Sequence, residues 1–201
     1  MRWRASLPKR LGVPRAGLTS DRVVTEAERL IDQVGFDKLS LATLAETLGV
    51  RQPSLYKHIA GLPALRQAVA VRAKAELAGV LGRAAVGKSG SAAVRALAVA
   101  YRTWAHEHPG RYVAALRAPD PTDPDDTAAG AAAVSVVFEV LAGYELHGTD
   151  AVHAARALRS ALHGFVSLEA AGGFGLPYDL DDSYDRLVDG LVNSLESARS
   201  G

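Results

Sequence analysis

The chain has 201 residues, 48% of them hydrophobic, and no cysteine, which leaves ample apolar material for a core and excludes disulfides and thiolate metal sites. Its net charge of +1 hides an asymmetry: residues 1–74 hold thirteen Lys and Arg against six Asp and Glu (+7), and residues 75–201 hold ten against sixteen (−6). No apolar run reaches the roughly 18 residues of a membrane span, and no signal peptide is evident, so we expect a cytoplasmic protein without a membrane segment.

The first elements are an arm, a helix and a pair of short helices. Residues 1–18 are basic and interrupted by prolines, as expected of a flexible arm. Thr19 or Ser20 is placed to cap a helix that ends near Val34, since apolar residues recur along it at helical spacing. The stretch from 41 to 59, LATLAETLGVRQPSLYKHI, then predicts a helix-turn-helix.

Single residues mark the ends of these two short helices. Ser40 is placed to cap the first, and Gly49 follows it where a left-handed terminus favours glycine. Pro53 suits the first turn of the second helix, and Leu55 is expected to point into the core. A helix this short buries too little to stand alone. We therefore expect its polar side chains to face DNA, and the positive charge of residues 1–74 suits phosphate neutralisation.

The rest of the chain predicts further helices and no convincing strand, because apolar residues recur at helical spacing between Gly and Pro breaks. These helices are expected over Pro63 to about Ala85, Ser91–His108, Arg111–Arg117, Asp126–Leu146, Asp150–Ala171 and Asp181–Ala198. The fold is therefore expected to be all-α with about nine helices. A three-helix DNA-binding bundle would occupy residues 19–65, and a helical domain for ligand binding and dimerisation would occupy residues 66–201.

The segment from about Leu18 to Val71 resembles the DNA-binding domain of the TetR family of transcriptional regulators. The resemblance rests on Val34-Gly35-Phe36, on the run Leu-Ala-x-x-Leu-Gly-Val and on Pro-Ser-Leu-Tyr-Lys-His. The C-terminal half resembles the family branch with a His-Gly motif (WHG-type), here His163-Gly164. That branch commonly has tryptophan four residues before the histidine, where this chain has Arg159.

The expected DNA-binding residues lie on the second short helix and are Arg51, Gln52, Pro53, Ser54, Tyr56, Lys57 and His58. The first residues of a recognition helix contact base edges, and Arg can hold guanine and Gln adenine with two hydrogen bonds. Arg51 and Gln52 are therefore candidates for base contacts, with phosphate contact or simple exposure as alternatives. Ser54 is open to either a base or a phosphate. The family resemblance implies that Tyr56 and His58 bind phosphates.

One position departs from the family pattern. Many members carry lysine at the start of the fourth helix, where it meets phosphate, and this chain has Leu62 there. Arg10 and Arg15 of the arm are candidates to compensate by reaching the DNA backbone or minor groove. A solvated tail without DNA contact is the alternative.

Aromatic side chains and a histidine in the C-terminal half predict a site for a small, largely apolar effector. The expected ligand-binding residues are Tyr101, Trp104, Phe138, His163 and Phe165. Ordinary core packing is the alternative for the aromatic residues, and a backbone hydrogen bond is the alternative for the histidine. His106 and His108 project to different sides of a helix, so no metal site is expected, and no cofactor is implied.

The last two predicted helices carry apolar stripes, over residues 152–165 and 184–195, that the rest of the chain is too short to cover in full, with burial within a single chain as the alternative. Burial of these stripes against a second copy predicts a homodimer, and the family resemblance implies a four-helix bundle formed by these helices.

These features predict a repressor that a small apolar effector releases from a palindromic double-stranded DNA operator, and not an enzyme. Two alternatives stay open. One is a helical protein that binds DNA without sequence preference. The other is an all-helical enzyme using His163 and Glu169, although no nucleophile–base spacing, Gly-rich phosphate loop or ligand cluster supports it.

Overall fold

The computed structural model describes residues 17–199 and contains, within that range, eight α-helices, two 3₁₀-helices and no strand. The α-helices are α1 (Ser20–Val34), α2 (Leu41–Thr47), α3 (Leu62–Ala85), α4 (Gly90–Glu107), α5 (Pro109–Ala115), α6 (Pro124–Ala142), α7 (Gly148–Ala170) and α8 (Leu180–Arg199), and the 3₁₀-helices are η1 (Phe36–Lys38) and η2 (Gln52–Lys57). The expected all-α fold is confirmed. Most of the predicted arm, including Arg10 and Arg15, lies outside the described residues.

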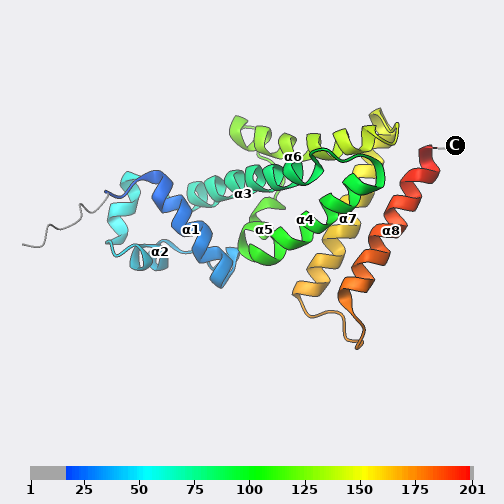
Figure 1. The fold of residues 1–201 in the computed structure, drawn as a ribbon. Helices are drawn as coiled ribbons and strands as arrows, with labels where there is room; N and C mark the ends of the chain where they lie inside the picture. The colour runs from blue at the N-terminus through cyan, green and yellow to red at the C-terminus, as the bar shows by residue number, and fades with distance from the viewer. Residues whose placement is uncertain (1–16, 200–201) are drawn as a thin grey trace, which may run out of the picture.

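A small head, formed by α1, η1, α2 and η2, lies at one end of the molecule, and α3 runs from it into the larger domain (Figure 1). There α3 packs against α4, α5 and α6, while α7 and α8 pack against each other and against α4. A single hydrophobic core extends from Val23 in the head to Leu195 in α8. The predicted domain boundary at residue 65 falls within α3, so the helix itself joins the two parts. Within the described range no helix is long and apolar enough to cross a membrane.

The predicted helix ends of the head are confirmed. The Thr19 side chain accepts a hydrogen bond from the Arg22 amide at 3.1 Å, and Ser40 Oγ accepts one from the Thr43 amide at 3.1 Å. These bonds satisfy amide groups that an α-helix leaves unpaired at its first turn. Gly49 has φ +66°, the left-handed conformation that glycine adopts without steric cost.

The second helix of the predicted helix-turn-helix is a 3₁₀-helix of six residues, η2. Its backbone bonds span three residues, as from the Ser54 amide to the Arg51 carbonyl and from the His58 amide to the Leu55 carbonyl, each at 2.8 Å. Short helical segments often adopt this tighter 3₁₀ form. The sequence pattern marked the position of this helix but did not reveal its hydrogen-bond pattern.

The bounds of α6 differ from those predicted. The helix begins at Pro124, because the Asp123 side chain accepts hydrogen bonds from the amides of residues 125 and 126 and caps it. It ends at Ala142 and not at Leu146, since the Leu146 amide folds back to the Leu141 carbonyl at 3.3 Å. Apolar residues continue past the true end, and this is why the periodicity placed it too late.

The apolar stripe of α8 is largely covered by the chain itself. Tyr184, Val188 and Val192 are buried against α4 and α7 within one chain. The Tyr184 hydroxyl donates to the Ala98 carbonyl at 2.7 Å, which fixes the start of α8 on α4. Leu187 and Leu191 of the same stripe are only half-buried, so the part of the stripe that remains for a second copy to cover is smaller than the sequence suggested.

The head is joined to the larger domain where α5 meets α1. A Cβ atom at Gly110 would lie 2.1 Å from the Ile31 carbonyl oxygen, so only glycine allows this contact. Beside it, the Arg111 side chain donates to Asp32 of α1 (2.7 Å) and to Glu76 of α3 (2.7 Å), and the Arg111 amide donates to Asp32 (2.9 Å). Three helices thus meet at one small junction.

We predict that Gly110→Ala destabilises the protein by at least about 1–3 kcal/mol, the usual cost of overpacking, because backbone and not a flexible side chain would have to move. The free energy of unfolding from urea titration measures this. Gly82→Ala in α3 is the matched control, since its added Cβ meets Val136 at an ordinary 3.7 Å, and alanine in a helix interior is favoured by about 1 kcal/mol. Equal effects of the two substitutions would contradict the close contact.

Candidate DNA-binding surface and effector cavity

The polar residues predicted to contact DNA lie together on η2 and the residues beside it. Arg51, Gln52, Pro53 and Lys57 are exposed, as is Tyr56, with 56% of its surface accessible. Ser54 and His58 are half-buried. Leu55 is fully buried among the hydrophobic residues of the head, as predicted. One side of this short segment is therefore fixed in the core, and the other is available to a partner.

A hydrogen bond ties the end of η2 to the start of α1. Ser20 Oγ donates to the His58 carbonyl oxygen at 2.9 Å, and the Ile59 amide donates to the Leu55 carbonyl at 3.0 Å. The first bond holds the segment against α1, and the second closes the last turn of the segment itself.

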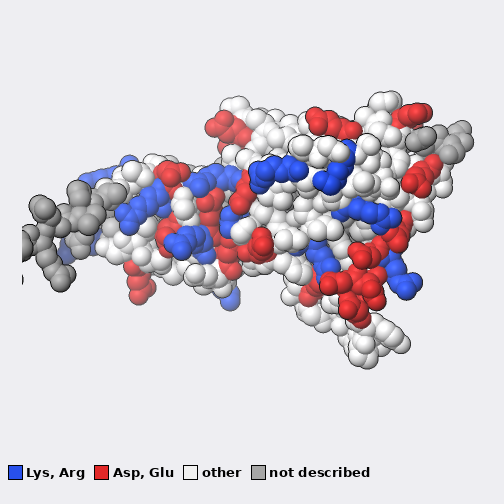
Figure 2. Space-filling view, viewed as in Figure 1, with Lys and Arg blue, Asp and Glu red and all other residues white. Residues whose placement is uncertain are grey.

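The positive charge of the first third is distributed differently from what the sequence suggested. Five of the thirteen cationic residues in 1–74 lie in residues 1–16, outside the described range. At least four more have internal partners: Arg29 pairs with Glu26, Arg66 donates to backbone carbonyls, Arg72 pairs with carboxylates of α1, and Lys74 pairs with Asp126. Figure 2 shows Lys and Arg interspersed with acidic residues between the head and the larger domain. The charge count alone is thus a weaker argument for DNA binding than the exposed side of η2.

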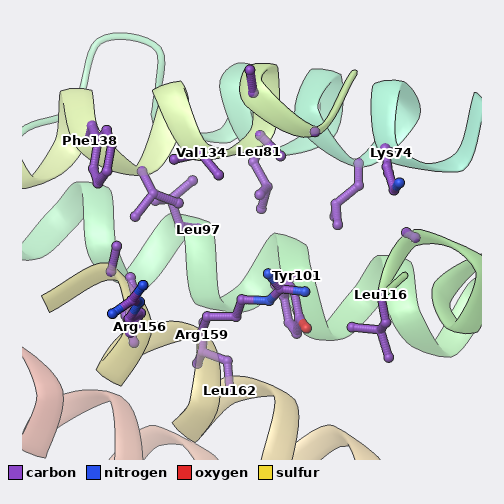
Figure 3. A pocket seen from close by; sticks show the side chains of 18 of the residues that line it. Lys74, Leu81, Leu97, Tyr101, Leu116, Val134, Phe138, Arg156, Arg159 and Leu162 are labelled. Carbon is purple, nitrogen blue, oxygen red and sulfur yellow. The ribbon is translucent and has the colours of Figure 1, made fainter. Parts of the chain in front are cut away.

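A cavity of about 460 Å³ lies between α3, α4, α6 and α7 (Figure 3). The described residues that line it are Lys74, Leu77, Leu81, Leu97, Tyr101, Ala115, Leu116, Arg117, Pro119, Gly130, Ala131, Ala133, Val134, Val137, Phe138, Val152, Ala155, Arg156, Leu158, Arg159 and Leu162. Its volume suits one small molecule. Of the residues expected to bind a ligand, Tyr101 and Phe138 line this cavity, whereas Trp104, His163 and Phe165 do not.

Trp104 and Phe165 pack outside the cavity. The Trp104 ring meets His108 edge-on, with centroids 5.6 Å apart. Phe165 packs against Phe174 (4.8 Å) and Tyr184 (5.0 Å) between α7 and α8. The surroundings of both residues are therefore those of ordinary core packing, which was the alternative to ligand binding.

His163 reaches the cavity wall indirectly. Its Nδ1 lies 2.6 Å from the Tyr112 hydroxyl, which is 3.0 Å from the Tyr101 hydroxyl. Burial raises the pKa of Tyr101, the contact with Tyr112 raises it further, and the nearby charge of Arg159 acts in the opposite direction. Burial also raises the pKa of Tyr112, so both tyrosine hydroxyls stay protonated at neutral pH in this chain of three side chains behind the cavity.

A buried ion pair closes the cavity near the start of α6. Lys74 Nζ lies 2.5 Å from Asp126 Oδ1, and Gln67 Nε2 and the Asp120 amide donate to the other oxygen at 2.9 and 2.8 Å. Burial by itself would raise the pKa of Asp126, but the hydrogen bonds from Lys74, Asp120 and Gln67 together hold it below its ordinary value. The sequence pattern did not predict this pair. Lys74 and Asp126 both lie in amphipathic helical stretches, where a charged residue is expected on the exposed side.

The cavity and the head share a structural element, the short helix α5. Its N-terminal end forms the junction with α1, and Ala115 and Leu116 at its C-terminal end line the cavity. The next residue, Arg117, also lines the cavity, and its guanidinium lies over the Phe36 ring of the head, 5.8 Å from the centroid. A molecule that displaced this end of α5 would therefore act on residues that touch the head.

The histidines and acidic residues considered for metal binding or catalysis have separate partners. His106 Nε2 lies 2.7 Å from Glu169, whereas His108 Nδ1 lies 2.6 Å from Arg111. The Arg102 guanidinium holds the pKa of Glu169 below its ordinary value, so this carboxylate is ionised at neutral pH. Among residues 17–199 no group of three potential ligands is placed to hold a metal ion.

Comparisons with known proteins identify the family. Residues 23–60 match the bacterial regulatory proteins of the tetR family, and residues 94–191 match the tetracyclin repressor-like C-terminal domain. An HTH-type transcriptional regulator from Mycobacterium tuberculosis is 41% identical over 82% of this chain and 81% of its own length. This chain belongs to the TetR family. The HTH-type transcriptional regulator YobS from Bacillus subtilis, 37% identical, matches 90% of the chain and 95% of its own length.

Solved structures of similar proteins agree with this assignment to the TetR family. A protein of unknown function from Rhodococcus sp. RHA1 is 28% identical, with a TM-score of 0.74 over 91% of this chain and 98% of that one. A TetR variant from Acinetobacter baumannii AYE, crystallised with minocycline, is 25% identical, with a TM-score of 0.68 over 92% of this chain and 100% of that one. The family and the fold of this TetR-family regulator are thus supported along nearly the whole chain.

We predict that Asp126→Asn destabilises the protein by about 3–5 kcal/mol, because it leaves the Lys74 ammonium buried without a counter-ion. Since the pKa of Asp126 is lowered in the folded state, the wild type has this stabilisation in full above the ordinary carboxyl pKa of 3.8 and loses it as the pH falls through the lowered pKa. The variant should therefore lose less stability on acidification.

Unfolding in urea between pH 3 and 7 measures both effects. The neighbouring Asp125→Asn is the control, because Asp125 is exposed and a surface change of this kind usually costs less than about 0.5 kcal/mol. If the two variants were equally stable and equally sensitive to pH, the buried pair would not have the role described.

Proposed function

We propose that this TetR-family regulator acts as a homodimeric, ligand-responsive, sequence-specific DNA-binding protein of the cytoplasm, most simply a repressor. The observation that supports the proposal best is the orientation of η2, with Leu55 fixed in the core and Gln52 and Tyr56 exposed on the other side. In a dimer, two such segments would enter successive major grooves roughly 34–36 Å apart on a near-palindromic operator.

The residues at the start of η2 would read bases and those at its end would fix the register. Arg51 and Gln52 are exposed and suited to paired hydrogen bonds with guanine and adenine. Pro53 and Ser54 follow at the same face, and Tyr56, Lys57 and His58 would bind phosphates. Leu62 is half-buried and packs against the core, so α3 begins without a phosphate contact at that position.

The dimer would form through the outer faces of α7 and α8. Between these helices lies a groove whose lining includes small residues, among them Ala154, Ala157, Ser194 and Ala198. Small side chains let helices of a second copy approach closely, and Leu191 in the same groove is only partly buried within one chain.

The cavity would hold the effector, with α5 and α3 passing its effect to the head. Tyr101 and Phe138 would contact it directly, whereas Trp104, His163 and Phe165 would support the surrounding packing. The effector weakens operator binding only if it prefers a conformation with differently spaced heads, and a full switch requires a preference of about 5.5 kcal/mol. The Gly110 junction would transmit a shift of α5 to α1 and, through the Ser20–His58 hydrogen bond, to η2.

Selection of operators from a random pool of double-stranded DNA tests the proposal. The protein should enrich one near-palindromic sequence, and a footprint should show two protected half-sites about one helical turn apart. Affinity that falls with salt but is the same for every sequence would contradict sequence-specific regulation and would favour a non-specific DNA-binding protein.

We predict that Gln52→Ala weakens binding to the selected operator by about 1–3 kcal/mol and relaxes the preference at one base pair of each half-site. Tyr56→Phe, which removes only a hydroxyl, should weaken binding to all sequences by a similar factor. Titration of operators with single base changes separates the two effects. A uniform loss for the Gln52 variant would show that this residue does not read a base.

A further prediction concerns the dimer. Ala157→Arg places a large charged side chain in the groove between α7 and α8, so sedimentation should show a shift from dimer to monomer and operator binding should weaken. Ala132→Arg on the exposed side of α6 is the matched control and should leave the dimer intact. An unaffected dimer in the Ala157 variant would place the interface elsewhere.

A further inference from the structure

We infer that the effector of this cavity is an amphiphile with one anionic head, a carboxylate, on an extended apolar body, and that Arg159 and Arg156 bind that head. The inference rests on the proposed function of the cavity as an effector site and specifies the chemistry of the ligand. It follows from which charges line the cavity and which of them have partners.

The wall of the cavity carries positive charge and no negative charge. Among the described residues that line it are four cations, Lys74, Arg117, Arg156 and Arg159, and no Asp or Glu. Apart from these and Tyr101, the side chains of the lining are apolar. An apolar ligand with a cationic group would therefore find no counter-ion, whereas an anionic group would find several.

Two of the four cations are already engaged. Lys74 is neutralised by the buried carboxylate of Asp126 at 2.5 Å, so it offers little charge to a ligand. The guanidinium of Arg117 lies over the Phe36 ring, whose electron-rich face attracts the cation toward the head. Neither side chain is free to turn toward a ligand without breaking an existing contact.

Arg156 and Arg159 are different. Neither makes a hydrogen bond or an ion pair with any residue that the structure describes, and both are exposed at the cavity. They are three residues apart in α7, which places them on the same side of the helix. In Figure 3 they project from α7 opposite Val134 and Phe138 of α6, with Arg159 extending toward Tyr101. Two adjacent guanidinium groups beside an apolar chamber match a carboxylate attached to a hydrocarbon.

The geometry also assigns an orientation to the ligand. The head would lie at α7 with Arg159 and Arg156, and the body would extend between α4 and α6, where Leu97, Val134 and Phe138 form the wall. A guanidinium can give a carboxylate two parallel hydrogen bonds. Since both arginines are accessible to water, their contribution should decrease as the salt concentration rises.

Isothermal titration with dodecanoate, 1-dodecanol and dodecylamine, all below micellar concentration, tests the inference on the full-length protein. These probes share one hydrocarbon chain and differ only in the charge of the head. We expect dodecanoate to bind about tenfold more tightly than the alcohol, and the amine to bind least. Equal affinity for dodecanoate and the alcohol, or tighter binding of the amine, would overturn the inference.

Variants assign the effect to the proposed residues. In Arg159→Gln, and more so in Arg156→Gln/Arg159→Gln, the preference for dodecanoate over the alcohol should disappear while affinity for the alcohol stays the same. Arg159→Lys, which keeps the charge, should retain most of the preference. Arg83→Gln, on an exposed part of α3 outside the cavity, is the control and should behave as wild type. A preference that persists in the double variant would overturn the assignment.

Operator binding by the same variants separates this inference from the proposed function. Each variant should still bind the selected operator in the absence of ligand, because Arg156 and Arg159 lie on α7, away from η2. If operator binding is intact but the probes bind with equal affinity whatever their charge, the inferred ligand class is wrong, whereas the proposed function as a DNA-binding regulator is retained. If no operator is selected at all, the proposed function fails irrespective of the probes.

Discussion

The close contact between Gly110 of α5 and Ile31 of α1 is the constraint on which the relation between the head and the larger domain depends. There is no room at this point for even one Cβ atom, so α5 cannot move toward α1 without displacing it. Arg111 extends the contact by joining Asp32 of α1 to Glu76 of α3. The head is therefore packed as a continuation of the same core.

The cavity is placed where such a movement would begin. Its wall includes the C-terminal end of α5, a stretch of α3 and the facing sides of α4, α6 and α7. The Lys74–Asp126 pair, with Gln67, holds α3 against the start of α6 and removes a positive charge from the lining. Arg117 lies over the Phe36 ring, and the two cations that make no such contact are on α7, on the far side of the cavity from this pair. Packing thus determines the shape of the chamber, while two arginines determine its electrostatic preference.

Much of the fold could be predicted because it depends on local rules. Thr19, Ser40 and Gly49 mark helix ends through the hydrogen bonds and backbone angles that their side chains permit, and Leu55 points inward because of its spacing. The limits of α6 were harder to place, since apolar residues continue into the following turn. Likewise, the sequence could not show that η2 is a 3₁₀-helix, because in a segment of six residues the periods of the two helix types are too similar to distinguish.

The site itself was less predictable. Periodicity shows which side of a helix faces inward, but it cannot show whether the neighbouring helix fills the space there or leaves a cavity. Tyr101 and Trp104 occupy the same helix three residues apart, yet only Tyr101 reaches the chamber. Arg159 stands where the related branch of the family commonly has tryptophan, and this substitution was the one sequence signal that pointed to a different cavity wall.

The absence of cysteine from the chain allows the central claim to be measured directly. A single cysteine at the exposed Glu46 of α2, spin-labelled in each subunit, reports the distance between the two heads of a dimer by pulsed electron paramagnetic resonance. With the selected operator bound, the account predicts one narrow distance distribution, narrower than that of the free protein, because successive major grooves fix the spacing of the heads. Absence of any dipolar coupling, or a distribution that operator DNA leaves unchanged, would contradict it.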